Sequence, residues 1–153
     1  MPGVRLLTDV ERAVTDSIPL EVDCGLVRVY EGDCSGRTGW LRRLVLLASR
    51  NRAIALGNHV FLPDRCNGDL GTVVHELTHC GQYQAWGPLK YFARGFVAQA
   101  RHVIHRTVRI GQNPYRYQLE PGKPFRAYGM EQQAQMIEDH FRSRNQDQAV
   151  PSA

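Results

Sequence analysis

Two histidines and a glutamate stand in the run His75-Glu76-Leu77-Thr78-His79. On a helix, positions i and i+4 share one face, so His75 and His79 can bind one metal ion together. Glu76 lies one step round the helix, where its carboxylate can reach a water molecule on that ion without being a ligand. Zinc with three protein ligands and an open position makes such a water nucleophilic near neutral pH. The motif predicts metal-assisted amide hydrolysis, with Glu76 as the catalytic acid and base.

A third ligand has to come from another part of the chain, because the residues after His79 contain no further histidine at helical spacing. The candidates lie in the last third of the sequence: Glu120, Glu131, Glu138, Asp139 and His140. Glu131 opens a helix-forming run beside the small Ala134, and a carboxylate would complete the His-His-Glu set that suits catalytic zinc. The alternative is a first-turn acid favoured by the helix dipole. Glu138 has another acid beside it and suits a supporting or surface position better.

Tyrosines between the two predicted ligand helices are candidates for stabilising the oxyanion of the reaction. These are Tyr115, Tyr117 and Tyr128. We assign Tyr115 as the second catalytic residue because it follows Asn113-Pro114 in a rigid turn; the alternative is that all three are packing aromatics.

The elements that must position these groups follow from periodicity and from capping residues. The HExxH motif falls in a helix over 70–86, capped by Asn67 or Asp69 and stopped by Gly87-Pro88. A second long helix over 89–108 should turn Phe92, Phe96 and Val97 inward. The remaining elements are a helix at 5–18, a strand at 27–30, a helix from Thr38 to about Ser49, one or two strands in 53–63 with a bend at Gly57-Asn58, an irregular connection at 111–129 and a helix at 130–144.

The chain of 153 residues is expected to form a single domain over residues 1–144, followed by a flexible polar tail at 145–153. A hydrophobic share of 42% and a charged share of 22% exclude a coiled coil and a wholly disordered chain. No apolar run is long enough for a transmembrane segment, and the N-terminus lacks the apolar core of a signal peptide, so synthesis in the cytoplasm is expected.

The cysteines Cys24, Cys34, Cys66 and Cys80 are expected to be free thiols, with one disulfide as the alternative.

Positive charge is concentrated in one part of the sequence. From Gly81 to Leu119 there is no Asp or Glu, whereas six Lys and Arg residues occur between Lys90 and Arg116. This basic segment could attract an acidic partner or polymer. The alternative is a solvated helix face balanced by acids elsewhere in the fold.

Several runs of the sequence resemble known metallopeptidase domains. VRVY, AIALGNHVFLP and HELTHCGQYQ resemble the eCIS-core domain, a small zinc peptidase domain found with contractile injection systems. GPLKYF, NPYRY and YGMEQQA resemble the metallopeptidase domains fused to type VI secretion spike proteins, and the two resemblances together span residues 25–142. The chain departs from the family at Cys80-Gly81, which replaces an apolar pair. It also departs at Gln135, where related enzymes place an aspartate that orients the first histidine, so Gln135 itself is a candidate for that task.

The resemblance implies an α+β, zincin-like fold of the gluzincin type. It implies a small mixed sheet, the HExxH helix and a helical C-terminal half that carries the third ligand. The metal ligands would be His75, His79 and Glu131, the ion Zn2+, and the catalytic acid and base Glu76. In zincins the strand corresponding to 53–63 borders the cleft and can pair with an extended peptide.

The function expected from these features is that of a zinc metalloprotease that hydrolyses peptide bonds in a peptide or protein substrate. The resemblance adds a setting: a bacterial effector toxin that is secreted or injected by a contractile secretion system, with a secretion-spike protein as partner. One alternative is a proteolytically silent, zinc-stabilised binding module or component of the secretion apparatus. Another is a cell-wall peptidase or amidase, which the basic segment would suit.

Overall fold

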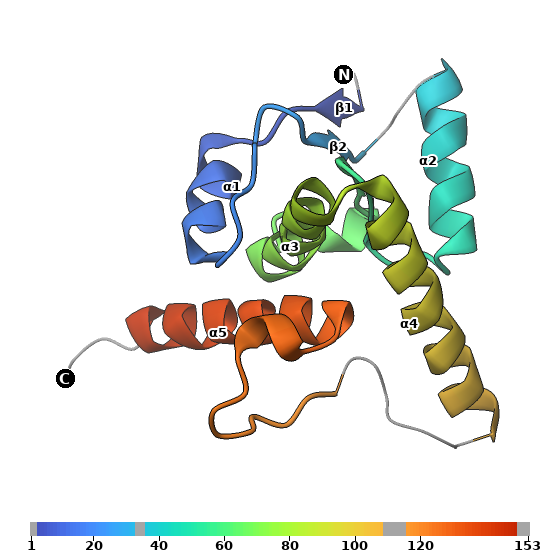
Figure 1. The fold of residues 1–153 in the computed structure, drawn as a ribbon. Helices are drawn as coiled ribbons and strands as arrows, with labels where there is room; N and C mark the ends of the chain where they lie inside the picture. Colours follow the sequence, from blue (N-terminus) through green and yellow to red (C-terminus); the bar gives the residue numbers. More distant parts are fainter. Residues whose placement is uncertain (1–2, 33–35, 109–115, 150–153) are drawn as a thin grey trace.

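The computed structural model describes residues 3–32, 36–108 and 116–149. Figure 1 shows helix α3 at the centre, with helix α5 running beside it and helix α4 extending away from the body. In chain order the elements are β1 (Val4–Arg5), α1 (Asp9–Ala13), η1 (Val14–Ser17), β2 (Arg28–Tyr30), α2 (Gly36–Ala48), β3 (Ile54–Leu56), β4 (His59–Phe61), η2 (Asp64–Cys66), α3 (Leu70–Trp86), α4 (Pro88–Val108), η3 (Phe125–Ala127) and α5 (Met130–Ala149).

The strands form one small mixed sheet in the order β1-β2-β4-β3. The β2 and β4 strands are parallel, whereas β1 pairs antiparallel to β2 and β3 antiparallel to β4. A two-residue turn joins β3 to β4, and Gly57 takes the left-handed φ of 63° there, which glycine adopts without a steric penalty. The predicted bend at Gly57-Asn58 and the α+β class with a small mixed sheet are therefore confirmed. The sheet leaves β3 at an edge.

Helix α3 is the centre of the core. Asp69 caps its first turn, because the Asp69 carboxylate accepts hydrogen bonds from the backbone N–H groups of Gly71 and Thr72. Val74, Leu77 and Cys80 have no exposed surface, since the sheet lies against one side of the helix and α5 against another. This burial fixes the orientation of the HExxH residues, which share the helix with these core side chains.

Helix α5 packs on α3 and runs further than the sequence pattern predicted. The helix continues to Ala149 instead of ending at Arg144, so the expected polar tail begins as helix. The reason is that residues 145–150 contain no glycine or proline, and the first residue that must interrupt a helix is Pro151. Residues 150–153 lie outside the part of the chain that the structure describes.

Helix α4 differs from the prediction in what it buries. Tyr91, near its start, is buried, but Phe92 is 50% exposed, Phe96 77% and Val97 48%. The expectation that these apolar residues face inward was wrong. Periodicity identifies an apolar face but not what covers it, and α4 extends beyond the body of the molecule (Figure 1).

Two other helices begin at different places from those predicted. Val4–Arg5 pairs with β2 as a strand, and α1 starts only at Asp9, where Thr8 and Glu11 form a capping box. Helix α2 starts at Gly36, so Thr38 lies within it and does not cap it.

Three cysteines can be placed. Cys24, Cys66 and Cys80 are free thiols, as expected, and Cys34 lies outside the described residues. Among the helices that the structure describes, none is long and apolar enough to cross a membrane.

Candidate metal centre

The three residues predicted as metal ligands converge on one point. One ligand atom from each of His75, His79 and Glu131 lies within 4.8 Å of the other two. Oε2 of Glu131 is 3.8 Å from His75 Nε2 and 3.4 Å from His79 Nε2. Among the described residues, this is the cluster of His, Cys, Asp and Glu side chains that could hold a metal ion.

A carboxylate from α5 orients His75. The Nδ1 atom of His75 lies 3.0 Å from Glu138 Oε2. An ionised carboxylate only accepts hydrogen bonds, so Nδ1 carries a proton towards Glu138, and Nε2, on the side of Glu131, is the nitrogen that can bind a metal ion after it loses its proton. Gln135, the candidate for this task, instead donates to Asp139 at 2.9 Å and to Glu138 at 3.4 Å. Glu138 is seven residues after Glu131, so the two acids share a face of α5.

Two buried glutamines orient His79. His79 Nδ1 lies 2.9 Å from Gln82 Oε1. The amide nitrogen of Gln82 donates to the Met130 carbonyl at 3.1 Å and to Gln133 Oε1 at 3.0 Å, and Gln133 donates to the Tyr128 carbonyl at 2.8 Å. Carbonyl oxygens cannot donate, so this chain leaves only an acceptor facing His79 and places the ring proton on Nδ1. Sequence reasoning did not identify Gln82 or Gln133, because a glutamine in a helix has no signature of burial.

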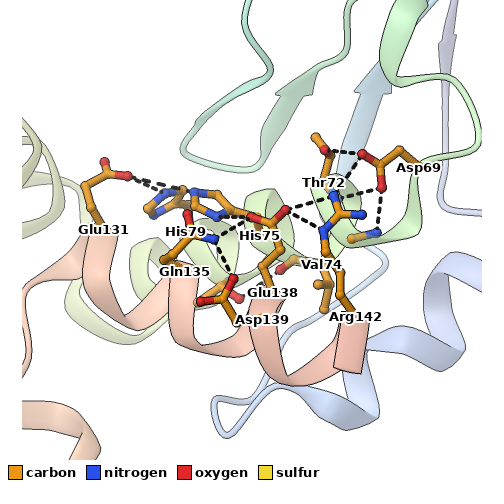
Figure 2. A network of polar contacts seen from close by, with 12 residues as sticks. Asp69, Thr72, Val74, His75, His79, Glu131, Gln135, Glu138, Asp139 and Arg142 are labelled. Carbon is orange, nitrogen blue, oxygen red and sulfur yellow. Dashed lines mark hydrogen bonds and ion pairs between the residues drawn. The ribbon is translucent and has the colours of Figure 1, made fainter. Parts of the chain in front are cut away.

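Glu138, the partner of His75, is linked through Arg142 to the start of α3, as Figure 2 shows. Arg142 Nε donates to Glu138 Oε1 at 2.8 Å, and Arg142 Nη2 donates to Asp69 Oδ2 at 2.9 Å. Asp69 also caps α3 and accepts from the Thr72 hydroxyl at 2.7 Å. The guanidinium lies across Gly71, where an added Cβ would be only 2.5 Å from Arg142 Nε. Glycine at this position therefore leaves the space that the clamp of Glu138, Arg142 and Asp69 needs.

The charges of the cluster favour a cation. Burial opposes the imidazolium form of His75, but hydrogen bonds to Glu131 and Glu138 raise its pKa to about 10. Burial also opposes the ionised form of Glu131, yet the attraction of His79 and His75 brings the pKa of Glu131 well below its usual range. Burial opposes charge on His79 as well, and Glu131 still raises the pKa of His79. Once the protons on Nε2 are released, two ring nitrogens beside an ionised carboxylate form the donor set that zinc prefers, so the residues present fit Zn2+.

Glu76 lies beside the cluster but outside its ligand set. Its side chain is buried, and burial is the main cause that raises the pKa of the carboxyl group. The backbone N–H of Ala55 on β3 donates to the carboxylate. The Ala55 carbonyl accepts from the Tyr91 hydroxyl at 3.0 Å. Both backbone polar groups of Ala55 are thus engaged within the chain, which limits the strand pairing expected along this edge.

A cavity of about 670 Å³ opens over the cluster. His75, Glu76, His79 and Glu131 all line it, so a molecule inside the cavity meets the metal centre and Glu76 together. Tyr91 lines it as well. The volume is that of a site for an organic ligand or a short peptide segment.

The other sequence-predicted residues lie apart from this cluster or cannot be placed. Tyr115 lies outside the described residues. Tyr117 donates to Asp139 at 2.8 Å, and the Tyr128 hydroxyl accepts from the Glu120 backbone N–H at 3.0 Å. Three rejected ligand candidates are exposed: Glu120, Asp139 and His140.

Only side chains near the two ends of the basic segment can be described. Lys90 and Arg94 are exposed, and the Arg94 guanidinium lies 4.4 Å from the centre of the Trp86 ring. The side chains of Arg101, Arg106, Arg109 and the histidines between them lie outside the described residues. Arg116 is exposed.

Comparison with known proteins gives one partial similarity. The type VI secretion system spike protein VgrG2b of Pseudomonas aeruginosa is 34% identical to this chain over 76 residues, which are 50% of the chain and 7% of the spike protein. The chain therefore corresponds to a small part of that relative. No family model matches the sequence, and no solved structure matches it. The similarity links the chain distantly to type VI secretion.

Proposed function

We propose that this chain is a zinc-dependent peptidase of the zincin type. The observation that carries the proposal is the convergence of His75, His79 and Glu131, from two helices, beside the buried carboxylate of Glu76 in one open cavity. Each ring is turned so that Nε2 faces the cluster, which is the arrangement that metal ligation requires.

The chain's own residues supply positioning and proton transfer. When bound, zinc supplies Lewis-acid chemistry that activates water and polarises a carbonyl group. Glu76 takes one proton from water as the water oxygen bonds to the carbonyl carbon, and it gives that proton to the nitrogen as the C–N bond breaks. The raised pKa of Glu76 suits a group that must accept and release a proton near neutral pH. The Ala55 N–H holds the carboxylate in place for both steps.

The test is hydrolysis of an unfolded protein by the zinc-loaded chain, with and without a chelator. Glu76→Gln is the control variant, because it keeps the shape of the side chain and removes the proton acceptor. We expect the wild type to cut, the chelator to stop cutting, and Glu76→Gln to bind zinc without cutting. Zinc binding with no cutting by the wild type would favour the silent module, and cutting of purified cell wall alone would favour the cell-wall enzyme.

The similarity to a spike protein supports a setting in type VI secretion, in which this chain acts as an effector delivered with a spike. A strain that lacks an assembled secretion apparatus should then retain the protein in its cells. Release of the protein at wild-type levels from such a strain would contradict this setting.

A further inference from the structure

Two sets of apolar residues line the cavity, which is called the groove, and each set is called a wall. One wall comes from the end of α2 and from the β3 segment, and the other from α4. The first wall includes Val45, Ala48, Ile54 and Leu56, and the second includes Phe92, Gly95 and Phe96. The metal cluster and Glu76 line the same cavity.

The α4 wall exposes large apolar side chains. Phe92 is 50% exposed and Phe96 is 77% exposed, although they line the same cavity as the buried Glu76. Removing apolar surface from water is favourable in proportion to the area that is covered. A ligand with apolar side chains would therefore be stabilised by lying against this wall, and exposed patches of this kind mark binding sites.

Gly95 gives the α4 wall its depth. A glycine inside a helix destabilises the helix relative to alanine. Packing does not require it here, because an added Cβ would meet only Met130 Sδ, at an ordinary contact distance of 4.0 Å. Gly95 lines the groove between Phe92 and Phe96, so its missing side chain leaves room for a bulky group of a ligand.

Both walls come from segments without acidic residues. Residues 34–63 and 81–119 contain no Asp or Glu, and all acids of the chain lie elsewhere. Arg52 is exposed, lines the groove and donates to the Ser49 carbonyl at 3.3 Å. Among the described residues, no carboxylate lies within ion-pair distance of Arg52. The acids that line the cavity belong to the metal centre and its support, whereas a peptide that reaches Arg52 meets a guanidinium without a carboxylate beside it, which favours an acidic residue at that point.

We infer that the groove binds an extended peptide segment in which a bulky apolar side chain fills the space at Gly95 and acidic residues beside it pair with Arg52. The inference rests on the proposed function and names its substrate class. It also identifies Gly95 and Arg52 as residues that determine specificity without taking part in the chemistry.

The test measures binding to zinc-loaded Glu76→Gln, which should hold a peptide without cutting it. Three fluorescent peptides of equal length are compared: phenylalanine between aspartates, phenylalanine between lysines, and alanine between aspartates. We expect the first to bind about tenfold more tightly than either of the others at low salt, with the charge preference shrinking at high salt. Equal binding of the aspartate and lysine peptides would overturn the inference.

Two variants, each with a matched control, test the named residues. Gly95→Leu should abolish the preference for phenylalanine over alanine, whereas Ala93→Leu, on the exposed surface of the same helix, should keep it. Leucine is a better helix former than glycine, so misfolding would not explain the loss. Arg52→Glu should remove the preference for acid, whereas Arg144→Glu, an equal charge change at an exposed position of α5, should not.

The outcomes separate the two proposals. Selective binding by a chain that cuts nothing would leave the inferred groove in place and refute the peptidase. Cutting without any preference among the three peptides would support the peptidase and refute the inferred specificity of the groove.

Discussion

Substituting Gly71 with alanine should weaken metal binding from a position that touches no ligand. The new methyl group would lie 2.5 Å from Arg142 Nε, well inside van der Waals contact, so the guanidinium must move. Its hydrogen bonds to Glu138 and Asp69, at 2.8 and 2.9 Å, would be lost together. Glu138 would then hold His75 with one fewer partner.

The two consequences differ in size. Arg142 is 42% exposed, and such ion pairs contribute about 0.2–1 kcal/mol each. Alanine stabilises a helix by about 0.5–1 kcal/mol relative to glycine, which offsets the loss of the ion pairs. The free energy of unfolding of the metal-free protein should therefore change by less than about 1 kcal/mol. Losing a residue that is hydrogen-bonded directly to a metal ligand lowers metal affinity 10–100-fold. Arg142 is one hydrogen bond further from the metal, so we expect a loss of about three- to tenfold in zinc affinity.

The measurement is a double-mutant cycle of Gly71→Ala and Arg142→Ala. Zinc affinity is determined by competition with a chelator, and unfolding of the metal-free protein by urea. If Gly71 acts through Arg142, the alanine at 71 should weaken zinc binding in the wild type and have no further effect in Arg142→Ala. An equal loss in both backgrounds would refute the mechanism and indicate that residue 71 acts on the start of α3 by itself.

Three more results are expected. Glu131→Ala should lose stoichiometric zinc after dialysis, whereas Glu120→Ala, at an exposed position, should retain it. Gln82→Leu should lower the free energy of unfolding by about 1–3 kcal/mol, measured in urea, because it leaves buried partners of the amide unsatisfied. Apparent zinc affinity should rise as pH increases from 6.5 to about 10, since His75 must release a proton to bind the ion and its pKa is raised to about 10. The same shift stabilises the metal-free protein fully below pH 6.5, and this contribution is lost as pH rises through about 10. Proton release measured by calorimetry in two buffers would check the sign, and an affinity independent of pH would contradict it.

The local part of the site could be predicted from the sequence, because it depends on short spacings. The interval of four between His75 and His79 fixes their common face on any helix. The cap at Asp69 and the turn at Gly57 follow from the same kind of local rule. The convergence of Glu131 was expected from the resemblance, since spacing alone left five candidates open.

The supporting contacts depend on how α5 lies against α3, which no local pattern encodes. Glu138 orients His75 because the helices bring them together across 63 positions of sequence. Gln135 was the candidate for orienting His75, but Glu138 makes that contact instead. Phe96 is a case in which the expected packing partner is missing among the described residues. Its spacing on α4 is typical of a core face, yet nothing in the sequence specifies whether another element will cover that face.

Helix α4 contributes a wall of the groove and none of the three candidate ligands, whereas α3 and α5 hold all three. On the function proposed above, the chemistry would depend on α3 and α5, and part of the choice of substrate on α4. Mutations on the groove face of α4 should then change the preferred peptide without changing zinc affinity. A library of substitutions confined to this face is the corresponding route for a protein engineer who wants to change peptide preference and keep the metal centre.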